Sequence, residues 1–146
     1  MLKKSILSLC IVIIFCMFCC CSNSSMEGDN GGDVSKVIKT IGDSTVYTTE
    51  DIESAMNTVT NYFSNTKGFQ NCTLTELYYD EAISSSDSKE WAEQYGANEA
   101  IVLISSFDVG AENEHSGLDP NRTYNNFKWI LVRPEYGVWT LETWGY

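Results

Sequence analysis

The segment Glu99–Val109 constrains the fold of this chain more than any other segment. Apolar side chains occupy both of its alternating faces: Ala100, Val102 and Ile104 on one, and Ile101, Leu103 and Phe107 on the other. A strand with two apolar faces needs a covering layer on each side, because both faces must be removed from water. We therefore expect Glu99–Val109 to be a central strand of a sheet that is covered on both sides.

A second segment predicts a helix that covers part of this sheet. Thr48 and Thr49, followed by Glu50 and Asp51, suit a helix start, because hydroxyl groups cap the first amides and acids favour the positive end of the helix dipole. Apolar residues then recur at steps of three and four up to Gly68. They give one stripe over about four turns, formed by Ile52, Ala55, Met56, Val59, Tyr62 and Phe63.

The remaining segments indicate mostly strands. Residues 72–79 are β-branched and aromatic, which is typical of a strand. The turn Pro134–Gly137 separates residues 124–133 from residues 138–144, and this spacing predicts a hairpin. Within the hairpin, strand alternation turns Trp129 and Trp139 inward and groups a partly exposed Trp144 with Glu142 and Tyr146. Residues 34–41 fit either a short helical turn or an early strand.

A second, short helix is expected over residues 88–95, with Gly96 as its stop. Together these segments predict the fold class α+β: a cone-shaped, curved antiparallel sheet wrapped around one long N-terminal helix, with the second short helix beside it.

The first residues are typical of an export signal. Lys3 and Lys4 precede an apolar run over residues 6–20, and polar residues follow at once. The run is shorter than the roughly 20 residues that cross a bilayer as a helix, so a permanent membrane span is the weaker alternative. Cys21, with Cys20 before it, resembles the lipidated cysteine of a bacterial lipobox. Cys20 as the acceptor, and ordinary cleavage without a lipid, remain open alternatives.

The chain thus divides into a signal over residues 1–20, a flexible tether with the lipidated cysteine over residues 21–33, and one folded domain over residues 34–146. The mature chain would carry 7 basic and 20 acidic side chains, a formal charge of −13. This charge excludes nucleic acid as a partner, because binding to phosphates needs a basic surface. Lys128 and Arg133, two of the few cations, are expected to pair with neighbouring carboxylates.

The arrangement of elements resembles the nuclear-transport-factor-2-like, or cystatin-like, cone fold. The segments TEDIESAMNTVTNYF, LTELYYDE and QYGANEAIVLISSF, with the closing NNFKWILVRPEYGVWTLETWGY, resemble an uncharacterised family of lipoproteins from Gram-positive bacteria. The similarity covers about Thr49 to Tyr146. It implies a cone fold and an extracytoplasmic location at the cell membrane, and it implies no reaction and no catalytic residues.

A cone of this kind often holds a pocket between the long helix and the sheet. Its lining would come from Met56, Tyr62, Phe63, Tyr78, Phe107, Trp129 and Trp144, and ordinary core packing is the alternative for these residues. Asp80 or Asp108, near strand ends, could act there as a general base with Tyr78 as a hydrogen-bond donor. That would make the protein a small-molecule isomerase or dehydratase.

We favour a non-catalytic domain that binds a small ligand or an envelope protein. No catalytic constellation and no cofactor motif is present, and His115, the only histidine, lacks companions for a zinc site. The acidic loop from Asp108 to Asp119 leaves weak calcium binding open, although its spacing is not that of an EF-hand. A structural accessory of an envelope complex would show a filled cone and an exposed patch around Trp144 and Tyr146.

The lipid anchor can be tested in the producing cell. We expect Cys21→Ser to abolish labelling of the protein by a radioactive or clickable fatty acid, because the thioether needs the thiol. Labelling that persists in Cys21→Ser and disappears in Cys20→Ser would move the acceptor to Cys20.

Overall fold

The computed structural model describes residues 31–112 and 117–146. The predicted export signal, Cys20, Cys21 and the predicted tether up to residue 30 lie outside the described residues, as does His115. None of the helices in the described part of the chain is long and apolar enough to span a membrane.

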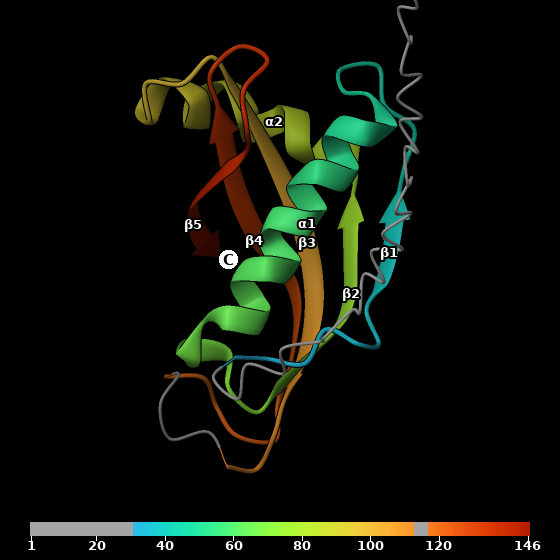
Figure 1. The fold of residues 1–146 in the computed structure, drawn as a ribbon, viewed down its shortest axis with the longest axis vertical. Coiled ribbons are helices and arrows are strands. Elements are labelled where there is room, and N and C mark those ends of the chain that lie inside the picture. Colours follow the sequence, from blue (N-terminus) through green and yellow to red (C-terminus); the bar gives the residue numbers. More distant parts are fainter. Residues whose placement is uncertain (1–30, 113–116) are drawn as a thin grey trace, which may run out of the picture.

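The domain is α+β, with two helices and one five-stranded mixed sheet (Figure 1). The sheet has the order β1-β2-β3-β4-β5. In chain order the elements are β1 (Ile38–Ile41), α1 (Thr49–Asn65), a 3-10 turn (Lys67–Phe69), β2 (Cys72–Tyr79), α2 (Glu81–Gln94), β3 (Glu99–Val109), β4 (Thr123–Arg133) and β5 (Thr140–Gly145).

The prediction of a wholly antiparallel sheet is wrong at one edge. Strands β2 to β5 pair antiparallel, but β1 pairs parallel to β2, with Ile38 opposite Glu76 and Ile41 opposite Tyr79. Of the two alternatives for residues 34–41, the strand is therefore observed. Helix α1 carries the chain from β1 back to the start of β2, and such a crossover makes the two strands parallel.

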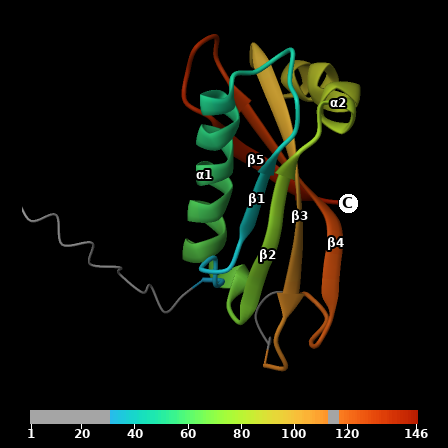
Figure 2. The ribbon, with the colours of Figure 1, turned by 90° about the vertical axis from the view of Figure 1, so that its right-hand side faces the viewer.

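The expectation for Glu99–Val109 is confirmed, because β3 is covered on both faces. Helix α1 lies on one side of the sheet and α2 on the other, over one end only (Figure 2). On the α1 side, Ile101, Leu103 and Phe107 belong to the main core. On the α2 side, Ala100 packs with Ala92 of α2 in a second, smaller cluster.

Helix α2 is longer than predicted, since it begins at Glu81 rather than near residue 88. Asp80 caps it by accepting a hydrogen bond from the Ile83 amide at 3.1 Å. Serines are weak helix formers, so the serine-rich start of α2 does not predict a helix from the sequence. One of them, Ser84, is buried and accepts a 3.0 Å hydrogen bond from the Val102 amide of β3, beyond the point where β2 ends.

The predicted alternation in the last strand is wrong at Trp144. The pairing of β4 with β5 shifts between Leu131, opposite Leu141, and Ile130, opposite Thr143. Glu142 is the extra residue of this β-bulge, and an extra residue reverses the alternation that follows it. Trp144 therefore lies opposite Trp129 rather than sharing a face with Glu142. The inward orientation expected for Trp129 and Trp139 is confirmed by their burial.

The end of the predicted tether packs against the domain. The amide of Gly32 donates to the Phe63 carbonyl at 2.9 Å, and Asp33 bridges to β2 through the Cys72 carbonyl and the Leu74 amide, each at 2.8 Å. A Cβ on Gly32 would lie 2.2 Å from the Phe63 ring, so only glycine fits there. The ordered domain therefore includes residues 31–33, and the chain enters it beside the C-terminal end of α1.

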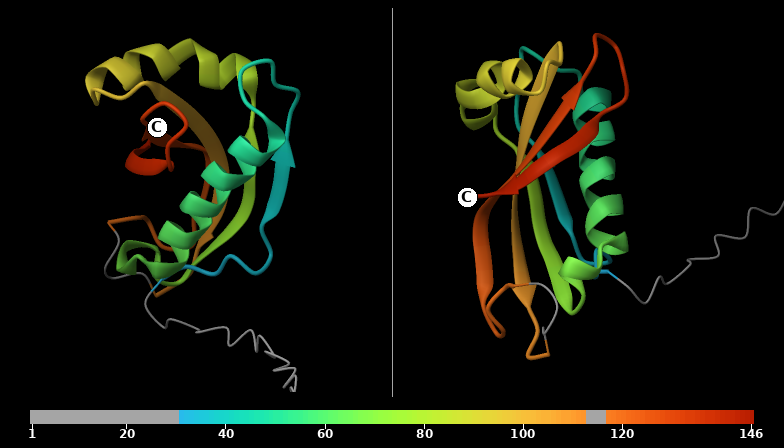
Figure 3. Two further views of the ribbon diagram at one scale, coloured as in Figure 1. Left: turned by 45° about the horizontal axis from the view of Figure 1, so that its top comes forward. Right: turned by 90° about the vertical axis from the view of Figure 1, so that its left-hand side faces the viewer.

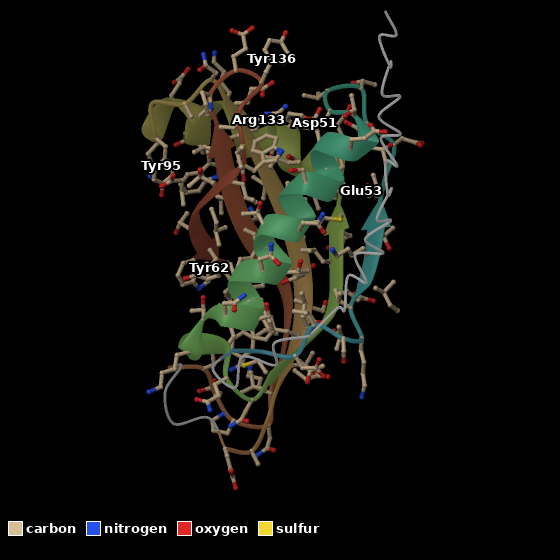
Figure 4. All side chains as sticks on the ribbon, viewed as in Figure 1. Asp51, Glu53, Tyr62, Tyr95, Arg133 and Tyr136 are labelled. Atoms are coloured by element: carbon tan, nitrogen blue, oxygen red, sulfur yellow. The ribbon has the colours of Figure 1, made fainter. Side chains whose placement is uncertain are left out.

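A nearly buried ion cluster joins the other end of α1 to the sheet (Figure 4). The Arg133 side chain is 9% exposed, and its Nη1 donates to Asp51 Oδ1 at 2.6 Å while its Nε donates to Glu99. Its guanidinium lies 4.1 Å from the centre of the Trp139 ring. The cluster thus ties together α1, β3 and β4, and it confirms that Arg133 pairs with carboxylates.

We expect Arg133→Met to lower the free energy of unfolding by about 2 kcal/mol at neutral pH, because two partly exposed carboxylates lose their partner. The hydrogen bond from Arg133 lowers the pKa of Asp51 below its ordinary value. The stabilisation from this depressed pKa is therefore full above that value and is lost as the pH falls through the lower folded-state pKa.

Urea unfolding followed by tryptophan fluorescence, at neutral pH and at about pH 3, checks this expectation. The difference between wild type and Arg133→Met should shrink in acid. The control is Lys128→Met, which breaks the more exposed pair with Asp87 and should cost less than about 1 kcal/mol. An equal cost for the two variants would contradict the clamp role of Arg133.

Candidate functional site

Side chains fill the space between α1 and the sheet, where the sequence places a pocket. Met56, Phe63, Phe107 and Trp129 are 0% exposed there. The rings of the three aromatic residues are in contact. The Phe63 ring centre lies 5.7 Å from that of Phe107 and 6.3 Å from that of Trp129. Such close ring packing is typical of a core, and it leaves these four side chains no contact with solvent.

Tyr62 and Trp144 lie at the border of this core, between α1 and β5. Their ring centres are 5.1 Å apart, and Trp144 is also stacked on buried Trp129 at 6.4 Å. Figure 4 labels Tyr62 on the flank of α1 that faces β5. Trp144 keeps 42% of its surface exposed, although one of its faces rests on the core.

Tyr146 continues this exposed surface along the sheet. Its ring lies 5.8 Å from Phe127 and 6.2 Å from Tyr124, and 76% of the residue is exposed. We call Tyr62, Trp144 and Tyr146 the aromatic strip. The bulge at Glu142 builds it, because without the extra residue Trp144 would turn to the opposite face.

Two of the three candidates for acid–base chemistry come together, and the third lies apart. Tyr78 and Asp80 line one groove of about 320 Å³ beside β1, with Glu76 and Ile38 also in its wall. This groove lies on the face of the sheet away from α1, since Tyr78 alternates with the core residues on either side of it. Asp108 lies at the far end of β3, opposite Thr73.

The groove beside β1 holds a protonated phenol next to carboxylates. Burial raises the pKa of Tyr78, and the charges of Asp80 and Glu76 raise it further, so the phenol stays a hydrogen-bond donor. Its hydroxyl donates to Asn126 at 3.4 Å. The Asp80 carboxylate is already engaged with the first turn of α2. The groove can therefore hold a polar group, but its carboxylate is positioned for helix capping.

Metal binding finds little support in the described part of the chain, where no three His, Cys, Asp or Glu side chains gather into a possible metal site. Asp108 accepts a hydrogen bond from Thr123, and Asp119 pairs with Arg122 at 2.8 Å. These two acids of the acidic loop, for which the sequence left weak calcium binding open, are thus bound to protein groups.

Sequence reasoning missed two exposed residues of the β4–β5 turn. Tyr136 is 89% exposed and Val138 is 82% exposed, whereas the hairpin itself is predicted correctly. A signal was present, because large apolar side chains are unusual in a short turn that also contains proline and glycine.

The role of Asp80 can be tested by stability. We expect Asp80→Ala to lower the free energy of unfolding by about 1 kcal/mol, through loss of the N-cap of α2. Asp80→Asn should stay close to wild type, because asparagine caps helices about equally well. Thermal unfolding followed by circular dichroism measures both. An asparagine variant as unstable as the alanine variant would show that the charge of Asp80 has a separate role.

Comparison with models of protein families, with curated proteins and with solved structures gave no match to this chain.

Proposed function

We propose that the protein is a membrane-anchored extracytoplasmic lipoprotein whose domain, a cystatin-like cone, binds an envelope protein and carries out no catalysis. The observation that carries this proposal is the aromatic strip. Trp144 and Tyr146 are exposed and Tyr62 is half-buried, beside a core in which Phe63 and Trp129 are fully buried.

The chemistry of the strip favours a protein partner. Tryptophan and tyrosine supply a large share of the binding energy at protein interfaces, because a rigid ring covers much area at little entropic cost. Trp144 is held in place by Tyr62 and Trp129, so little side-chain freedom would be lost on binding. A surface of this kind suits docking better than turnover of a small molecule.

The anchor proposed at Cys21 would place this surface near the membrane without embedding it. Residues 21–30, as a flexible segment, would span about 18 Å before the chain reaches Gly31. The formal charge of −13 on the mature chain opposes contact with anionic lipid headgroups. The domain would then stand off the bilayer and remain available to neighbouring proteins.

The alternative, an isomerase or dehydratase, has one observation in its favour, the shared groove of Tyr78 and Asp80. It needs a carboxylate that is free to take a proton from a substrate. Because Asp80 caps α2, the binding function has the stronger support.

We expect Tyr146→Ser and Trp144→Ala each to weaken association with the envelope partner about tenfold or more, as loss of an interface hot spot does. Quantitative co-purification after cross-linking in intact cells measures this. Tyr146→Ser is the cleaner variant, since Tyr146 is 76% exposed and contributes little to the core.

The matched control is Ile38→Ser, which removes an exposed apolar side chain from β1, away from the aromatic strip. This variant should retain all partners. An unchanged set and amount of partners in the strip variants, with folding verified by thermal unfolding, would refute the proposed function.

A further inference from the structure

A second exposed apolar surface lies at the opposite end of the molecule. Val46, in the loop between β1 and α1, is 59% exposed, and Tyr136 and Val138, in the β4–β5 turn, are exposed by 89% and 82%. We call these three residues the hairpin tip. The loops that carry them lie at the same end of the molecule (Figures 1 and 3), and the residues that follow Val46 and Val138, Tyr47 and Trp139, pack edge-on at 5.6 Å.

Tyr136 adopts a backbone conformation that tyrosine rarely adopts. Its φ is +57°, in the left-handed region where glycine and asparagine are the usual residues. Packing does not compensate for this, since the side chain is almost fully exposed. A strained residue that contributes little to the fold indicates a role outside the fold, because strain of this kind is concentrated at functional sites.

Both loops of the hairpin tip are held firmly from below. Glu81 accepts hydrogen bonds from the Thr45 amide at 2.6 Å, from the Thr45 hydroxyl at 2.7 Å and from the Ser44 hydroxyl at 2.8 Å. These bonds lower the pKa of Glu81 to about 2, so they persist at neutral pH. On the other loop, Arg133 lies against Trp139. The tip is thus preorganised, which reduces the entropy lost on binding.

The surroundings of the hairpin tip are acidic. Asp43, Glu50 and Glu135 lie in the same two loops and in the first turn of α1, and within residues 31–112 and 117–146 they form no ion pair. Arg133, the cation beneath the tip, is 8% exposed and already paired with two carboxylates. Apolar side chains surrounded by unpaired carboxylates fit a surface of opposite charge.

We propose that the hairpin tip docks a cationic polypeptide, a segment whose apolar side chains are flanked by lysine or arginine. Like charge opposes both a second copy of this chain and an anionic lipid surface as the occupant. The tip adjoins the N-terminal end of α1, whereas the chain enters at Gly31 beside the other end, about 25 Å away along the helix. If the anchor of the proposed function holds, the tip points away from the membrane.

The test uses the full chain in nanodiscs of neutral phosphatidylcholine and a fluorescent amphipathic peptide of leucine and lysine. Fluorescence anisotropy, with empty nanodiscs as baseline, measures binding. We expect Tyr136→Asn to weaken binding about tenfold and to raise the melting temperature, because asparagine relieves the left-handed strain. Val138→Thr should also weaken binding without unfolding the domain.

Three comparisons make the result decisive. Ile38→Thr, which changes an exposed apolar residue on β1, should leave binding unchanged. A peptide of leucine and glutamate with the same apolar pattern should bind at least tenfold more weakly, and added salt should weaken binding of the lysine peptide. Equal binding of the two peptides, or unchanged binding by Tyr136→Asn, would overturn this inference. Neither result would affect the aromatic strip, whose residues the test leaves intact.

Discussion

Burial of β3 on both faces is the constraint on which the rest of the domain depends. The sheet supplies hydrogen bonds on both edges of β3 for part of its length only, because β2 pairs with it as far as Ile104. Beyond that point Ser84 of α2 accepts from the Val102 amide, and the Tyr47 hydroxyl donates to the Ala100 carbonyl at 2.8 Å. Burial raises the pKa of Tyr47 to about 12, so this donor keeps its proton.

The same constraint explains why the described interior suits packing better than catalysis. A strand with two apolar faces requires a helix against each, and α1 meets its face with Met56 and Phe63, both 0% exposed. Exposed aromatic or apolar side chains can therefore gather only where a helix or the sheet ends or where two layers meet solvent. The aromatic strip lies at the border between α1 and β5, and the hairpin tip lies where two connecting loops meet.

Much of the fold could be predicted from the sequence, because local patterns decide it. The apolar periodicity of α1, the two apolar faces of β3 and the hairpin turn each depend on neighbours in the chain. The start of α2 could not be predicted in this way, since Ser84 is helical for a tertiary reason, its hydrogen bond to β3. Nor could the parallel pairing of β1, which depends on where α1 returns the chain.

The candidate site was less predictable, because its contacts also depend on tertiary structure rather than on local pattern. The ring contacts of Trp144 depend on a bulge, and one extra residue in a strand leaves no mark on composition or periodicity. Tyr78 was grouped with the core aromatics on residue type, but alternation along β2 turns it to the other face. Residue type alone does not specify a face.

The bulge at Glu142 also changes the open edge of the sheet. Strand β5 is the last in the sheet, so one edge of its backbone is open to pairing with another strand. Flat open edges of this kind can join into aggregates. A bulge that carries a negative charge twists and charges this edge. The residue that turns Trp144 toward the core therefore also makes this edge a poorer template for another strand.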